Sequence, residues 1–164
     1  MSKEPHITAR DLMAELENDA EFRRHREERE EKRRKLEAYY ANLDRPLLDK
    51  LTAKGFRLES LDELVKQDVL LPDDVVELLL ATLDSCDDRR QCEMLVRALT
   101  MAKNAFDGRP LTRCYDRVRD DEGVRWIILA AIAKLKPHSI EGWLETAAKN
   151  PYLRSSLERL GHEW

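Results

Sequence analysis

Hydrophobic positions in the C-terminal half of the chain recur at helical spacing. Leu95, Leu99 and Ala102 are separated by three or four residues, which places their side chains on one face of a helix. The same spacing, with Pro or acidic residues at the starts, predicts helices over 72–84, 88–104, 109–119, 121–136, 139–149 and 151–161. No segment shows the sustained alternation of a strand, so the pattern predicts an all-α protein.

The N-terminal part has a different pattern. Thr8, with Asp11 three residues on, predicts a capped helix that ends near Asp19. Its apolar stripe consists of Ile7, Leu12, Met13 and Leu16. The next helix is predicted over 20–43, and its stretch 23–35 contains no apolar residue, so it cannot pack on a core there. We therefore expect a solvated charged arm with acid-first pairs four residues apart, Glu28–Lys32, Glu30–Arg34 and Glu31–Lys35.

Between these two parts the sequence predicts short helices that cover the first repeat. Pro46 is expected to end or kink the preceding helix, and Gly55 to end the next one in a left-handed conformation. Ser60 with Glu63 predicts a capping box that opens a helix over 60–67. The predicted organisation is a charged N-terminal helical arm over 1–45, capping helices over 46–71 and a helical-repeat domain over 72–164.

Composition and charge narrow the classes of partner. Of the 164 residues, 42% are hydrophobic, which allows a core, and 38% are charged, which indicates a large solvated surface. The net charge of −4 argues against a dedicated duplex-binding domain, since phosphate binding needs a basic excess. Three cysteines without a pairing pattern, no apolar signal region and no long apolar run predict a cytoplasmic protein with reduced thiols and no membrane contact.

We find no constellation of residues that predicts catalysis. The histidines have no second metal ligand at the required spacing, and there is no phosphate-binding glycine loop or nucleophile elbow. Cys92 falls on an apolar helix face and is expected to be buried. Arg109, Arg113 and Arg117 share one helix face, which we interpret as a solvated mixed face rather than an anion site. The sequence therefore predicts no enzyme, no cofactor and no metal.

The helices of the C-terminal half repeat. A shift of 33 residues aligns Asp88 with Asp121, Leu95 with Ile128 and Leu99 with Ile132, and a shift of 29 aligns Ile128 with Leu157. The stretch 120–125, Asp-Asp-Glu-Gly-Val-Arg, followed by Ile128, Ala131, Ile132 and Leu135, resembles the HEAT-like helical repeats. The resemblance covers 72–161, and Cys92 stands where that pattern has an arginine. The N-terminal part looks like the head of small, poorly characterised bacterial proteins of this type.

This resemblance implies a short right-handed alpha-solenoid of about three helix pairs, preceded by a long charged N-terminal helix. In such an array the second helices of the pairs line the concave surface. Their core positions are expected to be Leu95, Leu99, Val124, Ile128, Ile132 and Leu157. The neighbouring outward positions form a candidate partner-binding strip: Glu93, Arg97, Thr100, Trp126, Ala130, Ala133, Ser155, Arg159 and His162.

The function expected from this strip is a non-enzymatic scaffold that binds a protein partner, as an adaptor or an immunity-type binder. Trp126 is the most informative position, as a contact hot spot or as core, while Trp143 is expected in the core. The N-terminal helix is a candidate dimer contact. The alternatives are a nucleic-acid-binding repeat protein and an enzyme like the HEAT-like DNA glycosylases, although the chain is short and acidic for that class.

Overall fold

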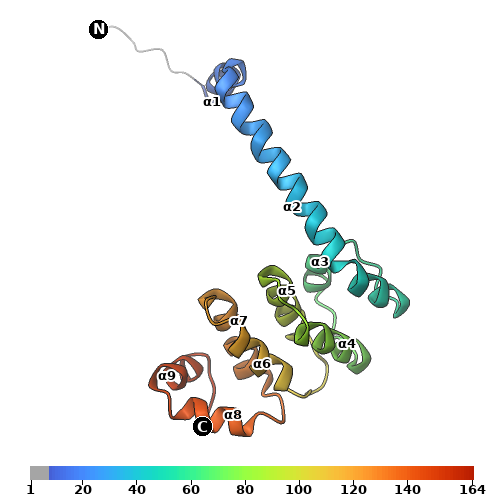
Figure 1. Cartoon of the computed structure of the whole chain (residues 1–164), viewed down its shortest axis with the longest axis vertical. Helices are drawn as coiled ribbons and strands as arrows, with labels where there is room; N and C mark the ends of the chain where they lie inside the picture. The colour runs from blue at the N-terminus through green and yellow to red at the C-terminus, as the bar shows by residue number, and fades with distance from the viewer. Residues whose placement is uncertain (1–7) are drawn as a thin grey trace. The chain divides into compact units, whose positions relative to one another are not determined.

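The computed structural model describes residues 8–164, which form two compact units, one up to Leu43 and the other Asp44–Trp164 (Figure 1). The helices in the described range are α1 (Ala9–Asn18), α2 (Ala20–Ala53), α3 (Leu61–Lys66), α4 (Asp73–Asp84), α5 (Arg89–Leu99), α6 (Arg109–Arg117), α7 (Glu122–Leu135), α8 (Glu141–Ala148) and α9 (Pro151–Arg159). None of the described residues belongs to a strand, so the predicted all-α class is confirmed.

The first helix begins with the predicted capping box. The Thr8 hydroxyl accepts a hydrogen bond from the Asp11 backbone N–H at 3.2 Å, and the Asp11 carboxylate accepts one from the Thr8 N–H at 3.2 Å. The predicted break at Asp19 is also present. Its carboxylate accepts a hydrogen bond from the Glu21 N–H at 2.8 Å, so the residue that ends α1 caps α2.

The apolar stripe of α1 is largely uncovered in the described part of the first unit. Leu12 and Met13 each keep 50% of their surface exposed, while Leu16 is half-buried. Ile7, the remaining member of the predicted stripe, lies outside the described residues.

The charged stretch of α2 carries ion pairs on its surface. The predicted Glu31–Lys35 pair is present at 2.7 Å. Glu30 pairs with Arg26 at 3.4 Å, one turn before it, rather than with the predicted Arg34. Since these side chains are exposed, solvent screens the pairs and each adds little to the stability of the helix.

Pro46 was predicted to end or kink the helix. The helix does not end there, because α2 continues to Ala53. A proline inside a helix costs about 3 kcal/mol through a lost hydrogen bond and a steric clash. Here Pro46 is exposed, while Leu47, Leu48 and Leu51 on the other side of the helix are buried in the core of the second unit. Burial of such side chains contributes about 1.5–3 kcal/mol each, which outweighs the cost of the proline.

The connection from α2 to α3 follows the sequence in one feature and departs from it in another. Gly55 ends α2 with φ +94°, as predicted for a left-handed cap. The predicted capping box at the start of α3 is wrong, because the Ser60 side chain makes no cap hydrogen bond. The Glu63 carboxylate instead accepts a hydrogen bond from the Glu59 N–H at 3.0 Å, one residue further back.

The helices of the second unit pack as consecutive pairs. Helix α4 packs on α5, α6 on α7, and α8 on α9. The first helices α4 and α6 also contact each other, and the second helices contact one another in the order α5, α7, α9 (Figure 1). Helix α3 packs on α5. All six helices predicted from residue 72 onward are therefore present, with ends that differ by a few residues.

The second helix of each pair begins at a polar cap. The side chains of Asp88, Asp121 and Asn150 accept hydrogen bonds of 2.9–3.2 Å from backbone N–H groups in the first turns of α5, α7 and α9. These positions are 33 and 29 residues apart, the two shifts that align the sequence with itself.

In the first two pairs, backbone hydrogen bonds also join the loop before the pair to the loop after it. The Leu71 N–H donates to the Met101 carbonyl at 2.8 Å, and the Leu71 carbonyl accepts from the Lys103 N–H at 3.0 Å. An equivalent pair of bonds, at 3.0 and 2.9 Å, joins the loop before α6 to the loop after α7. Helix α5 was predicted to run to residue 104 but ends at Leu99. The Met101 carbonyl and the Lys103 N–H bond to Leu71 instead of forming bonds within the helix.

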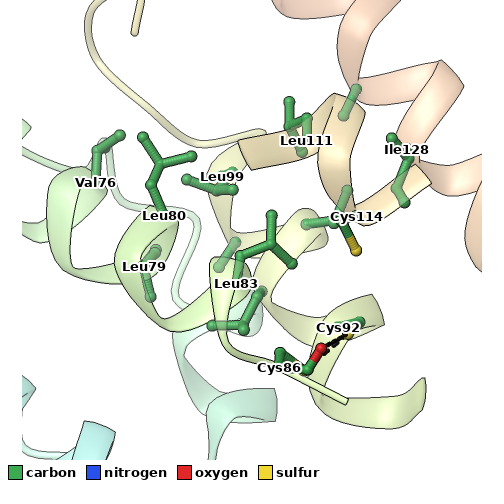
Figure 2. Close-up of a cluster of buried hydrophobic side chains, with 14 of the residues drawn as sticks. Val76, Leu79, Leu80, Leu83, Cys86, Cys92, Leu99, Leu111, Cys114 and Ile128 are labelled. Carbon is green, nitrogen blue, oxygen red and sulfur yellow. Dashed lines mark hydrogen bonds between the residues drawn. The ribbon is translucent and has the colours of Figure 1, made fainter. Parts of the chain in front are cut away.

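The core runs between the two sets of helices, and Figure 2 shows its centre, where side chains of α4, α5, α6 and α7 meet. The predicted core positions of the second helices are all buried: Leu95, Leu99, Val124, Ile128, Ile132 and Leu157. That burial leaves the other faces of α5, α7 and α9 to solvent.

Candidate partner-binding surface

The nine residues of the predicted strip lie on the second helices of the three pairs or directly after them. Those that the structure leaves exposed are Arg97, Trp126, Ser155 and Arg159, and those that are half-buried are Glu93, Thr100, Ala130 and His162. Because α5 contacts α7 and α7 contacts α9, the strip residues lie on neighbouring helices. We call the exposed and half-buried members the α5–α7–α9 strip.

Ala133 does not belong to this surface, which corrects the prediction. It keeps only 3% of its surface exposed, and its neighbours Ala131 and Ile132 are buried with it. Helix α7 contacts α5, α6 and α9, so a wider arc of this helix is covered than of a helix with two neighbours. The prediction assumed that a residue next to a core position on the helix is exposed, and this assumption fails near the end of α7.

Trp126 is exposed, with 41% of its surface open to solvent. It borders a hollow of about 60 Å³ whose other walls include Leu129 of α7 and Tyr152 of α9. Tyr152 is 61% exposed, so two aromatic rings from neighbouring helices stand at the rim. The volume is far below the roughly 300–1,000 Å³ of small-molecule sites. The remaining walls come from Tyr115, Glu122 and Arg125, so both apolar and charged side chains line the hollow.

Cations lie against the aromatic rings around this hollow. The Arg159 guanidinium is 5.7 Å from the centre of the Trp126 ring, and the Arg125 guanidinium is 4.2 Å from the centre of the Tyr115 ring. Burial raises the pKa of Tyr115, which therefore stays uncharged beside the arginine. Trp143 packs edge-on against Tyr115 at 5.5 Å and is half-buried against the core.

The α5 end of the strip is held by its own ion pair. The Glu93 carboxylate accepts a hydrogen bond from Arg97 Nε at 3.0 Å and lies 2.9 Å from another nitrogen of that guanidinium. The Thr100 hydroxyl donates to the Arg97 carbonyl at 2.6 Å. This end of the strip is therefore polar and close to neutral, whereas the Trp126 end is aromatic and carries arginines.

Of the residues that line the hollow, sequence reasoning predicted only Trp126 and missed Tyr115, Glu122, Arg125, Leu129 and Tyr152. Under the 29-residue shift Tyr152 aligns with Gly123, one turn before Trp126, so the repeat itself held the signal that these positions lie near each other. Arg125 entered the sequence analysis only as part of the stretch 120–125 that resembles the HEAT-like repeats. Its Nε is buried and makes no hydrogen bond within the described chain.

The arginines of α6 serve structural roles. Arg113 donates two hydrogen bonds to the Asp84 carboxylate at 2.8 and 2.6 Å, and Arg117 donates to the Asp84 carbonyl at 3.1 Å. Arg109 binds Asp107 and lowers the pKa of that carboxyl to about 2. Each guanidinium has a partner within the chain, in agreement with a mixed surface face rather than an anion site.

Within 8–164, no group of three or more His, Cys, Asp and Glu side chains is arranged to hold a metal ion. In the same range, no helix combines the length and the apolar character that crossing a membrane requires.

Comparison with known proteins gives no assignment. The chain matches none of the protein-family models, none of the curated proteins and none of the solved structures with which it was compared.

Proposed function

We propose that this chain is a non-enzymatic protein–protein interaction module whose second unit is a short right-handed alpha-solenoid of three helix pairs, α4/α5, α6/α7 and α8/α9. The packing of α4 on α6, and of α5, α7 and α9 in succession, supports this architecture. The equivalent caps at Asp88, Asp121 and Asn150 support it independently, because they recur at the shifts that relate the pairs in sequence.

The observation that carries the functional proposal is the exposure of Trp126 beside Tyr152. Large aromatic side chains are usually buried, and Trp, Tyr and Arg are the residues enriched at the energetic centres of protein interfaces. All three residue types meet around the hollow at the α7–α9 contact. We infer that a partner protein places an apolar side chain in this hollow and covers the α5–α7–α9 strip.

The surrounding charges indicate which partner surface fits. Arg159 and Arg125 stack on aromatic rings at the hollow, and Glu93 with Arg97 forms a neutral pair at the other end. A partner segment with an acidic residue next to its apolar anchor matches this arrangement, since a carboxylate pairs with a guanidinium whose stacking leaves its edge free.

A pull-down from the native host tests the proposal. The tagged chain is compared with Trp126→Ala and Arg97→Glu, and with Leu70→Ala, which removes a 65% exposed side chain that is not part of the strip. We expect one protein, identified by mass spectrometry, to be retained by the wild type and by Leu70→Ala and lost with Trp126→Ala. Truncation of a central aromatic anchor typically costs at least about 2 kcal/mol, or roughly a thirtyfold loss in affinity.

Circular dichroism of each variant provides the control, since an exposed side chain should be removable without unfolding the protein. Retention of the same partner by both strip variants would overturn the proposed surface. Equal loss of the partner with Leu70→Ala would show that the contact lies elsewhere.

A further inference from the structure

The three cysteines of the chain form one buried cluster. Cys86 lies in the turn after α4, Cys92 in the second turn of α5 and Cys114 in α6, and each keeps at most 3% of its surface exposed. The Sγ atoms of Cys86 and Cys92 are 2.7 Å apart (Figure 2). A disulfide bond is about 2.05 Å long, so these two sulfurs need to approach by well under 1 Å.

One of these cysteines borders a hollow at the surface. Cys86 lines a hollow of about 410 Å³ that also borders Arg89 and Arg117, whereas Cys92 and Cys114 are not part of its wall. A molecule as small as hydrogen peroxide fits this hollow many times over. Peroxide that enters this hollow meets Cys86 first. Because Cys92 is fully buried, its reaction with peroxide requires a local opening of the turn that contains Cys86.

The local chemistry distinguishes the two sulfurs. The pKa of Cys92 is lowered by its hydrogen bonds with Cys114 and Cys86 and by the nearby Arg117 guanidinium. The pKa values of Cys86 and Cys114 are raised, first because each hydrogen-bonds to Cys92 and second by burial. Cys92 is thus the sulfur on which negative charge collects, and the thiolate is the nucleophilic form.

We propose that Cys86 and Cys92 are an oxidisable thiol pair, which hydrogen peroxide converts into an intrachain disulfide. Cys92 Sγ attacks one peroxide oxygen, the O–O bond breaks, and the leaving hydroxide takes up the thiol proton to depart as water. The oxidised Cys92 is then a sulfenic acid.

Cys86 resolves this intermediate. Its sulfur attacks the sulfur of Cys92 as the Cys86 proton is lost, the S–S bond forms, and the S–O bond breaks. The hydroxide leaves with that proton as a second water. Two thiols and one peroxide thus give one disulfide and two waters, and a thiol reductant reverses the reaction.

The bond would join the α4–α5 turn to the early part of α5, around the Asp88 cap. Cys114 keeps its thiol and serves as a matched internal control, because it is equally buried in the same cluster.

Peptide mapping of the full chain tests the proposal. The folded protein is treated with hydrogen peroxide, quenched with catalase, unfolded, alkylated with N-ethylmaleimide and digested with trypsin. Cleavage after Arg89 and Arg90 falls between the two cysteines, so the disulfide appears as two joined peptides. We expect this product, a loss of about two hydrogen masses from the intact chain, and alkylation of Cys114 alone.

Variants sharpen the assignment. Cys114→Ser should form the same linkage, while Cys86→Ser should leave a sulfenic acid on Cys92 that dimedone traps. A linkage that includes Cys114, three alkylated thiols after peroxide treatment, or sulfinic acid on Cys92 with Cys86 free would overturn the proposal. Mapping of the wild type alone decides between these products even if a serine variant does not fold.

Discussion

Arg89, the first residue of α5, is ion-paired with Asp121, the residue that caps α7. The contact joins the starts of two neighbouring second helices. Asp121 makes two interactions: one carboxylate oxygen pairs with Arg89, and the other accepts a hydrogen bond from the Val124 N–H at 3.0 Å. Asp88 caps α5 in the same way, through the Gln91 N–H at 2.9 Å.

Removal of either cap is expected to destabilise the second unit. Asp88→Ala should lower the free energy of unfolding by about 1 kcal/mol, and Asp121→Ala by about 1–2 kcal/mol, because it also loses its ion pair with Arg89. Asp120→Ala, an exposed neighbour that caps nothing, should change stability by less than about 0.5 kcal/mol. Urea unfolding measures all three, and equal losses for Asp120 and Asp121 would contradict the capping assignment.

Two glycines should respond to alanine in opposite directions. A Cβ on Gly108 would lie 2.8 Å from side-chain carbons of both Ile140 and Pro137, and the proline ring cannot turn away. Gly108→Ala should therefore destabilise the protein by about 1–3 kcal/mol. Gly142 lies inside α8 with nothing within 4 Å, so Gly142→Ala should stabilise by up to about 1 kcal/mol. Thermal unfolding that ranks both variants alike would contradict the close approach of α6 to the loop before α8.

The Arg113–Asp84 pair should contribute stability that depends on pH. The hydrogen bonds from Arg113 lower the pKa of Asp84 below its ordinary 3.8. Since the folded state holds the carboxylate more strongly in its charged form, this contribution is present above pH 3.8 and is lost as the pH falls through the lowered pKa. Both partners are partly exposed, so Arg113→Ala should cost only about 0.5 kcal/mol at neutral pH. The cost should vanish in acid, and Arg57→Ala, an exposed loop arginine, provides the control.

Asp44 should show the opposite dependence. Its carboxyl is 2% exposed, and burial raises its pKa despite a 3.0 Å hydrogen bond from Gln91 Nε2 and the nearby Arg90. The folded state therefore favours the protonated form, and stability falls as the pH rises from 3.8 through the raised pKa. Asp44→Asn keeps an oxygen for Gln91 and should be more stable than the wild type at neutral pH but not in acid. A less stable variant at neutral pH would show that attraction to Arg90 outweighs the cost of burial.

Features that depend on a few consecutive residues could be predicted from the sequence. The capping box at Thr8, the break at Asp19, the left-handed Gly55 and the starts of α5, α7 and α9 were all predicted correctly. Each rests on hydrogen bonds or backbone preferences within about four residues, so the sequence window contains all the interacting groups. The core positions of the second helices were also predicted, because periodicity fixes which face is apolar.

Contacts between distant segments decided the rest. Burial of leucines on one side of α2 stabilises the helix beyond Pro46. Hydrogen bonds between Leu71 and the loop after α5 fix the end of that helix. Ala133 is buried in a helix that packs against three others. The hollow between Trp126 and Tyr152 and the approach of Cys86 to Cys92 likewise exist only once the helices pack. The sequence by itself determined which segments are helical and which faces are apolar, since both follow from local spacing. Where helices end and which side chains remain exposed was decided by the tertiary structure, because burial energies from distant partners exceed local preferences of about 1 kcal/mol per residue.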